Sequence, residues 1–157
     1  MSHFHAVPLV DDDELAAARA TLGAALPRIM GYLLEDGPQS IARIEEALSI
    51  GDAAMMVRPA HMLKGEARQL GCRRLGDLAE TIEHMARRCV DMHEMPTAGA
   101  TDIAMLRDCF DESLAMLQAR IPASPAIPPI HAAPARRAVG TPANGARVRL
   151  FGRRTPS

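Results

Sequence analysis

The residues best suited to chemistry in this sequence gather around one histidine, His61. Lys64 and Arg68 follow it, and Arg58 precedes it. Imidazole is a good nucleophile in its neutral form, and cationic side chains beside it can donate hydrogen bonds to an anion such as a phosphoryl group. This combination predicts a histidine that carries a charged group covalently.

The stretch around His61 has the periodicity of an amphipathic helix. On a helical wheel with about 3.6 residues per turn, its apolar residues share one side. They are Met56, Ala60, Leu63, Ala67 and Leu70. His61 falls on the opposite side, with Arg58, Lys64, Gly65 and Arg68. We therefore expect the apolar stripe to face the core and His61 to face water. A lone exposed histidine is more often an ordinary surface residue, so the neighbours carry the functional interpretation.

Two residues of this predicted helix are poor helix formers. Gly65 costs roughly 1 kcal/mol relative to alanine and leaves the backbone beside His61 bare for a partner. Pro59 costs about 3 kcal/mol inside a helix and frees the carbonyl of Met55. Either the helix bends at Pro59 or its regular part begins near it. Our hypothesis is that a bend there sets the presentation of His61.

The remaining periodicity predicts further amphipathic helices with short connections. They are expected from Asp11, over about 24–50, over 53–70, over 73–88, and from Thr101 or Asp102. Gly37-Pro38 either splits the second of these or bends one long helix. Gly71 is expected to close the third helix, and residues 91–101 to form a loop. This order predicts an all-α fold: an antiparallel four-helix bundle with a short N-terminal helix.

Composition divides the chain near residue 120. Residues 1–120 hold 12 Lys/Arg and 19 Asp/Glu, a net charge of −7, whereas residues 121–157 hold six arginines and no acid. Seven of the twelve prolines also lie in 121–157. We therefore expect a helical domain over 10–120 and a disordered tail over 121–157. The tail is best interpreted as a solvated appendage; the alternative is steering toward an acidic partner, a membrane surface or nucleic acid.

Several classes of function are disfavoured. No stretch of about 18 apolar residues predicts a transmembrane helix, the N-terminal residues do not resemble a secretory signal, and an acidic body is not typical of a nucleic-acid binder. Three cysteines without a CxxC pair fit a reduced cytoplasmic compartment. His84, Cys89 and His93 are poorly spaced as metal ligands, so no metal site is expected.

No ATP-binding or Gly-rich phosphate-binding motif is present, so we expect no autonomous kinase activity. A phosphoryl group would have to come from a partner. Two other functions stay open. One is a non-transferring helical docking module that binds and regulates a partner protein, with His61 unused. A helical hydrolase or metal-binding protein is less favoured, because no paired carboxylates, nucleophile elbow or ligand set is evident.

His61-x-Leu63-Lys64-Gly65, followed by Leu70-Gly71 and Leu75-x-x-Leu78, resembles the signature of histidine-phosphotransfer (HPt) domains of bacterial phosphorelays. The resemblance covers roughly residues 10–120 and implies a four-helix bundle. It also implies that His61 is phosphorylated, that Lys64 neutralises the phosphoryl group, that Gly65 clears the approach of a partner and that Gly71 ends the active helix.

The same resemblance implies the partners. These are response-regulator receiver domains and a hybrid histidine kinase, with reversible transfer between the imidazole and a receiver aspartate. The non-transferring docking module would instead bind and regulate a receiver or histidine kinase. Mg²⁺ is expected on the receiver and no cofactor on this chain, which we expect to be a cytoplasmic monomer. Glu66 and Arg68 stand where the family usually has small residues. Arg68 could add a phosphate or partner contact, and Glu66 could narrow partner choice by repelling acidic surfaces.

Overall fold

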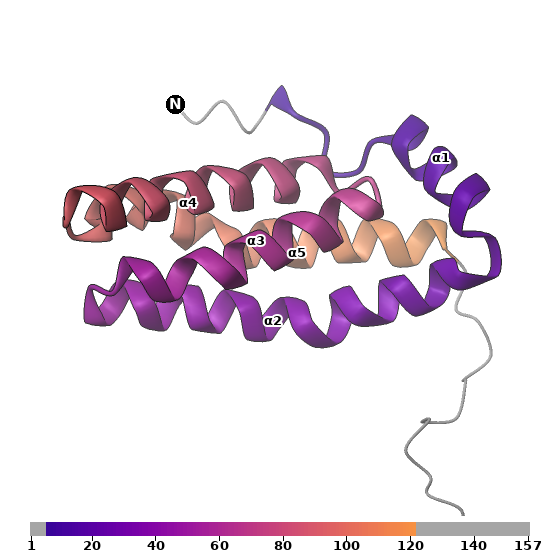
Figure 1. Ribbon diagram of the computed structural model, residues 1–157. Helices are drawn as coiled ribbons and strands as arrows, with labels where there is room; N and C mark the ends of the chain where they lie inside the picture. Colours follow the sequence, from indigo (N-terminus) through magenta and orange to yellow (C-terminus); the bar gives the residue numbers. More distant parts are fainter. Residues whose placement is uncertain (1–5, 122–157) are drawn as a thin grey trace, which may run out of the picture. The chain divides into compact units, whose positions relative to one another are not determined.

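The computed structural model describes residues 6–121, and this part of the chain is almost entirely helical. Its elements are α1 (Asp12–Leu22), the 3₁₀ turn η2 (Gly23–Ala25), α2 (Leu26–Ile50), α3 (Ala53–Gln69), α4 (Arg73–Met92), the 3₁₀ turn η3 (Pro96–Gly99) and α5 (Ala100–Arg120). Helices α2 to α5 run side by side, and α1 lies at one end of them (Figure 1). The predicted all-α bundle with a short N-terminal helix is confirmed. The predicted tail, from residue 122 onward, lies outside the described residues.

Helix α3 lies between α2 and α4, with which it makes most of its contacts. The apolar stripe predicted from the wheel is fully buried, with Met56, Ala60, Leu63, Ala67 and Leu70 all at 0% exposure. Burial of such a stripe is the main source of stability for a helix in a protein. The opposite face of α3, which carries His61, is therefore turned to solvent.

Helix α2 is continuous across Gly37-Pro38, so the sequence contains one long helix and not two. Packing requires glycine at position 37, because a Cβ there would collide with the ring of Phe110 on α5. Pro38 removes one helical hydrogen bond. Buried residues on both sides of it, such as Leu33 and Ile41, hold the helix in place.

Helix α3 begins and ends where its capping residues predict. The side chain of Asp52 accepts a hydrogen bond from the backbone N–H of Met55 at 3.2 Å, as an N-cap does. Gly71 follows the C-cap with φ +72°, the left-handed conformation that favours glycine. The helix runs unbroken through Pro59, whose ring is buried. Its regular part therefore does not begin near Pro59, and the effect of a bend there on His61 stays a prediction.

The connection between the last two helices differs from the prediction. Helix α4 continues past Arg88 to Met92, because the added turn buries Cys89 against the core. It ends at His93, a non-glycine residue with φ 57°, at a position where glycine or asparagine is the usual sequence signal. Within the predicted 91–101 loop, residues 91 and 92 belong to α4, Pro96–Gly99 form the turn η3, and α5 begins at Ala100 with Gly99 as its N-cap. Neither Thr101 nor Asp102 caps that helix.

The segment before α1 closes the turn between α3 and α4. The backbone N–H of Asp11 donates to the carbonyl of Gly71 at 2.8 Å. Arg74 donates through Nε to the carbonyl of Val7 at 2.8 Å. The carboxylate of Asp11 in turn caps α1 by accepting from the N–H groups of Asp13 and Glu14. The end of the helix that carries His61 is therefore fixed to the N-terminal segment.

Replacing Gly71 with alanine should lower the free energy of unfolding by about 1–3 kcal/mol. A Cβ at this position would lie 2.9 Å from the backbone nitrogen of Leu15 and 3.0 Å from the carbonyl of Asp11, in a conformation with φ +72°. Urea unfolding measures the change. Gly65→Ala is the matched control on the same helix, since a Cβ at this position meets nothing within 4 Å. This substitution should raise the free energy of unfolding by up to about 1 kcal/mol. Equal stabilities for the two variants would contradict the prediction.

Candidate functional site

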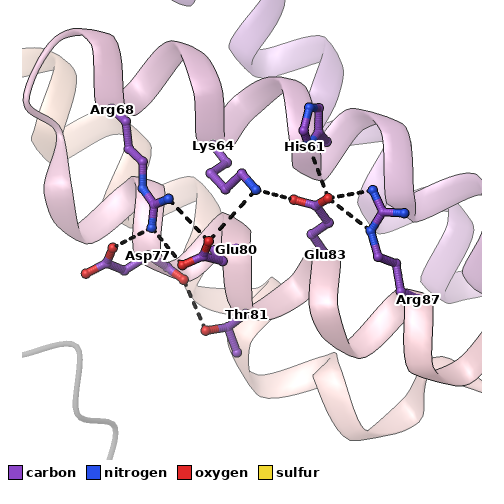
Figure 2. Close-up of polar contacts among 8 residues, drawn as sticks. All are labelled: His61, Lys64, Arg68, Asp77, Glu80, Thr81, Glu83 and Arg87. Carbon is purple, nitrogen blue, oxygen red and sulfur yellow. Dashed lines mark hydrogen bonds and ion pairs between the residues drawn. The ribbon is translucent and has the colours of Figure 1, made fainter.

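His61 projects from the exposed face of α3, and its side chain is 61% exposed. Its Nδ1 lies 3.1 Å from Oε1 of Glu83 on α4 (Figure 2). An ionised carboxylate only accepts hydrogen bonds, so Nδ1 carries the proton and donates it. The neutral imidazole then has its free lone pair on Nε2. The contact with Glu83 thus selects the tautomer whose Nε2 lone pair is free to act as a nucleophile.

Glu83 is the centre of the polar contacts around His61. Its side chain is only 4% exposed, and Nζ of Lys64 lies 2.7 Å from its Oε2. Arg87, one turn further along α4, donates to Oε1 through Nε at 3.0 Å and Nη2 at 2.7 Å. Burial would raise the pKa of this carboxyl, but the hydrogen bonds from Lys64, Arg87 and His61 outweigh it and lower the pKa to about 2. Glu83 is therefore an anion at neutral pH.

The sequence alone assigns no functional role to Glu83 or Arg87. A signal for Glu83 exists, because it shares the buried face of α4 with Ala79, Ile82 and Ala86. A lone acid within an apolar stripe needs partners, since an unpaired buried charge is costly. Arg87 stands four residues later, the spacing of a helical ion pair. The contact with His61 itself depends on how α3 and α4 are aligned, which local periodicity does not give.

The structure places the two predicted cations of α3 differently. Lys64 lies beside His61 on the α4 side and shares Glu83 with it (Figure 2). Arg68 is instead held by two other carboxylates. Its guanidinium donates to both oxygens of Glu80 at 3.2 and 2.7 Å and to Asp77 at 3.2 Å. Arg68 is therefore engaged away from His61.

The other residues expected near His61 differ in their exposure and in their contacts. The exposed side chain of Arg58 forms no hydrogen bond or ion pair with the rest of the described chain. Gly65 is exposed and leaves open space beside His61. Glu66 is half-buried, and burial together with the nearby charge of Asp36 raises its pKa. It therefore faces α2 more than the surface around His61, which weakens the idea that it repels acidic partners.

The weak metal-ligand set does not come together. Within residues 6–121, no three His, Cys, Asp or Glu side chains are grouped so as to hold a metal ion. Cys89 is buried, with its Sγ 3.7 Å from Sδ of Met85, whereas His84 and His93 are exposed. The three cysteines are all free thiols. Among the described helices, none is long and apolar enough to cross a membrane.

Comparison with known proteins identifies the family. The family model of the Hpt domain matches residues 28–120, more than half of the chain. The fold is similar to the crystal structure of histidine-containing phosphotransfer protein B (HptB) from Pseudomonas aeruginosa PAO1, with a TM-score of 0.63 and 21% identity. That match covers 73% of this chain and 95% of HptB. No curated protein sequence matches significantly. The chain belongs to the Hpt domain family.

Proposed function

We propose that this member of the Hpt family relays phosphoryl groups between receiver aspartates through Nε2 of His61. The observation that carries the proposal is the pairing of an exposed imidazole with a buried carboxylate, His61 Nδ1 to Glu83 Oε1 at 3.1 Å. This pairing leaves a lone pair directed outward on a side chain that is 61% exposed. A partner domain can therefore reach the nucleophile without any opening of the bundle.

The reaction needs no base to deprotonate His61. The lone pair of Nε2 attacks the phosphorus of the aspartyl phosphate, the N–P bond forms, and the P–O bond breaks with its electrons leaving on the aspartate carboxylate. The ring gains positive charge as the bond forms, while its proton stays on Nδ1. Glu83 lies against that proton and stabilises the charge. Transfer to a second receiver is the reverse of this step.

Lys64 can contact either of two partners in this mechanism, Glu83 or the phosphoryl group. Its ammonium lies 2.7 Å from Glu83 in the free protein and is one helical turn from His61. Lysine is a flexible point charge with three donors. It can turn toward a phosphoryl group on His61 while Arg87 continues to donate to Oε1 of Glu83. Positioning and charge stabilisation of this kind account for most catalysis of phosphoryl transfer.

The chain then acts as a phosphate carrier that depends on other proteins for the rest of the chemistry. Receiver domains and a hybrid histidine kinase are its partners, and the receiver supplies Mg²⁺, so the carrier needs no cofactor of its own. We place it in the cytoplasm as a monomer. The His61 face has the space for a receiver to dock, because Gly65 leaves the backbone bare.

Incubation with phosphorylated receivers of the source organism tests the proposal. Radiolabel should move from at least one receiver to the wild-type protein within minutes, and back to an unphosphorylated receiver. A receiver that bound tightly while its label stayed in place would favour the docking module instead. Labels that stayed on every receiver, without binding, would exclude both functions.

Gly65→Ala should slow transfer from a receiver several-fold while leaving the free protein at least as stable. The added Cβ meets nothing within the chain, so any loss of rate reports the approach of the partner. Because the receiver must bring its aspartate to within bonding distance of Nε2, a methyl group one turn away is expected to matter. Initial rates over a range of receiver concentrations measure the effect, which should appear as a higher KM for the receiver. An unchanged KM would show that the partner does not approach across Gly65.

A further inference from the structure

Arg68 joins α3 to α4 by the polar contacts already described. Its guanidinium lies between Glu80 and Asp77, and the Nη2–Glu80 Oε2 distance is 2.7 Å (Figure 2). The aliphatic part of the side chain lies over Gly76, where a Cβ would come within 2.8 Å of Cγ of Arg68. A buried glycine below the stem and two carboxylates around the head fix this long side chain in one position.

Glu80 has a second cation within reach. Nζ of Lys64 lies 3.9 Å from Oε1 of Glu80, against 2.7 Å from Oε2 of Glu83. Glu80 is ionised at neutral pH with or without Arg68, because the ordinary pKa of this carboxyl is 4.5 and the hydrogen bond from Arg68 lowers its pKa further. Both carboxylates therefore attract the same ammonium. In the structure Lys64 stays with Glu83, and Arg68 occupies both oxygens of Glu80.

We propose that Arg68 is a positioning residue for phosphotransfer, which neutralises Glu80 and so keeps Lys64 beside Glu83 and His61. The inference rests on the proposed function of His61 and assigns Arg68 a role other than contact with the phosphoryl group or the partner. Without Arg68, Glu80 would draw Lys64 one turn away and would leave an uncompensated negative charge near an incoming phosphoryl group. Both effects slow transfer.

Two substitutions separate this role from a structural one. Arg68→Ala leaves Glu80 unpaired, and Arg68→Ala combined with Glu80→Gln removes the competing charge as well. Arg107→Ala is the matched control, because Arg107 forms a similar inter-helix contact with Glu45, at 3.3 and 2.6 Å, between α5 and α2. Label transfer from a phosphorylated receiver gives the rates, and urea unfolding gives the stabilities.

Arg68→Ala should slow transfer roughly threefold to tenfold, as expected for one partly screened charge at this range. Adding Glu80→Gln should restore most of the rate, although the lost ion pair is not restored. Arg107→Ala should lose similar stability without a loss of rate. An unchanged rate for Arg68→Ala, or a slow variant that Glu80→Gln does not rescue, would overturn the inference while the wild-type protein still takes label. A wild-type protein that takes no label would refute the proposed function, and this inference with it.

Discussion

Replacing His61 with glutamine is expected to abolish phosphoryl acceptance while leaving the helical bundle folded. Glutamine has no ring nitrogen and cannot form the N–P bond. Its amide can still donate a hydrogen bond to Glu83, so the buried carboxylate keeps a partner at this position. The side chain is 61% exposed, and substitutions at such positions usually change stability by less than about 0.5 kcal/mol.

The matched control is His84→Gln, on the neighbouring helix. His84 is also an exposed histidine of the bundle, one residue after Glu83, but its ring has no comparable contact with that carboxylate in the described structure. The His84→Gln variant should accept label at the wild-type rate. Circular dichroism and urea unfolding of both variants establish that they are folded. Label on the His61 variant, or its loss from the His84 variant, would be incompatible with the assignment.

Glu83→Gln should slow phosphotransfer by about tenfold to a hundredfold, the second largest effect expected on function. The amide is neutral, so it no longer stabilises the positive charge that develops on the ring. It can also present its NH₂ group to Nδ1, which favours the tautomer with the proton on Nε2 and blocks the nucleophile. Single-turnover rates from a phosphorylated receiver measure the loss. A wild-type rate would show that Glu83 neither orients nor stabilises His61.

The same substitution should change how stability depends on pH. The folded-state pKa of Glu83 is lowered to about 2 from an ordinary value of 4.5. Its contribution is therefore fully present above about pH 5 and is lost as the pH falls toward 2. We expect the free energy of unfolding of the wild type to exceed that of Glu83→Gln by no more than about 3 kcal/mol near neutral pH. At pH 3 the difference between the two proteins should be less than about half of that value. A difference independent of pH would contradict the ionised network.

The sequence predicts the features that depend on one helix at a time. The wheel over α3 identifies both its buried stripe and the outward direction of His61, because a single rotation relates all its residues. Asp52 and Gly71 mark the ends of α3 through local hydrogen bonding and backbone conformation. The prolines are less informative. Pro38 and Pro59 both lie inside continuous helices, since buried apolar contacts on either side outweigh their local cost.

Features that depend on two helices were not predictable in the same way. Glu83 lies 22 residues from His61 in the sequence, and only the alignment of α3 with α4 brings them together. The wheel places Arg68 on the same face as His61, but it gives the direction of the Cα–Cβ bond and not the position of a long side chain's head. Glu80 and Asp77 decide that position. The geometry shows the Arg68 guanidinium held by these two carboxylates, and its contact with a phosphoryl group or a partner stays a prediction.

The most direct test is to determine which nitrogen carries the phosphoryl group. The wild-type protein, labelled with ¹⁵N in its histidines, is reacted with a phosphorylated receiver and examined by NMR at neutral to alkaline pH. A single phosphohistidine should form at His61, with phosphorus on Nε2 and the proton retained on Nδ1 beside Glu83. Phosphorylation of another side chain, or of Nδ1 of His61, would contradict the account.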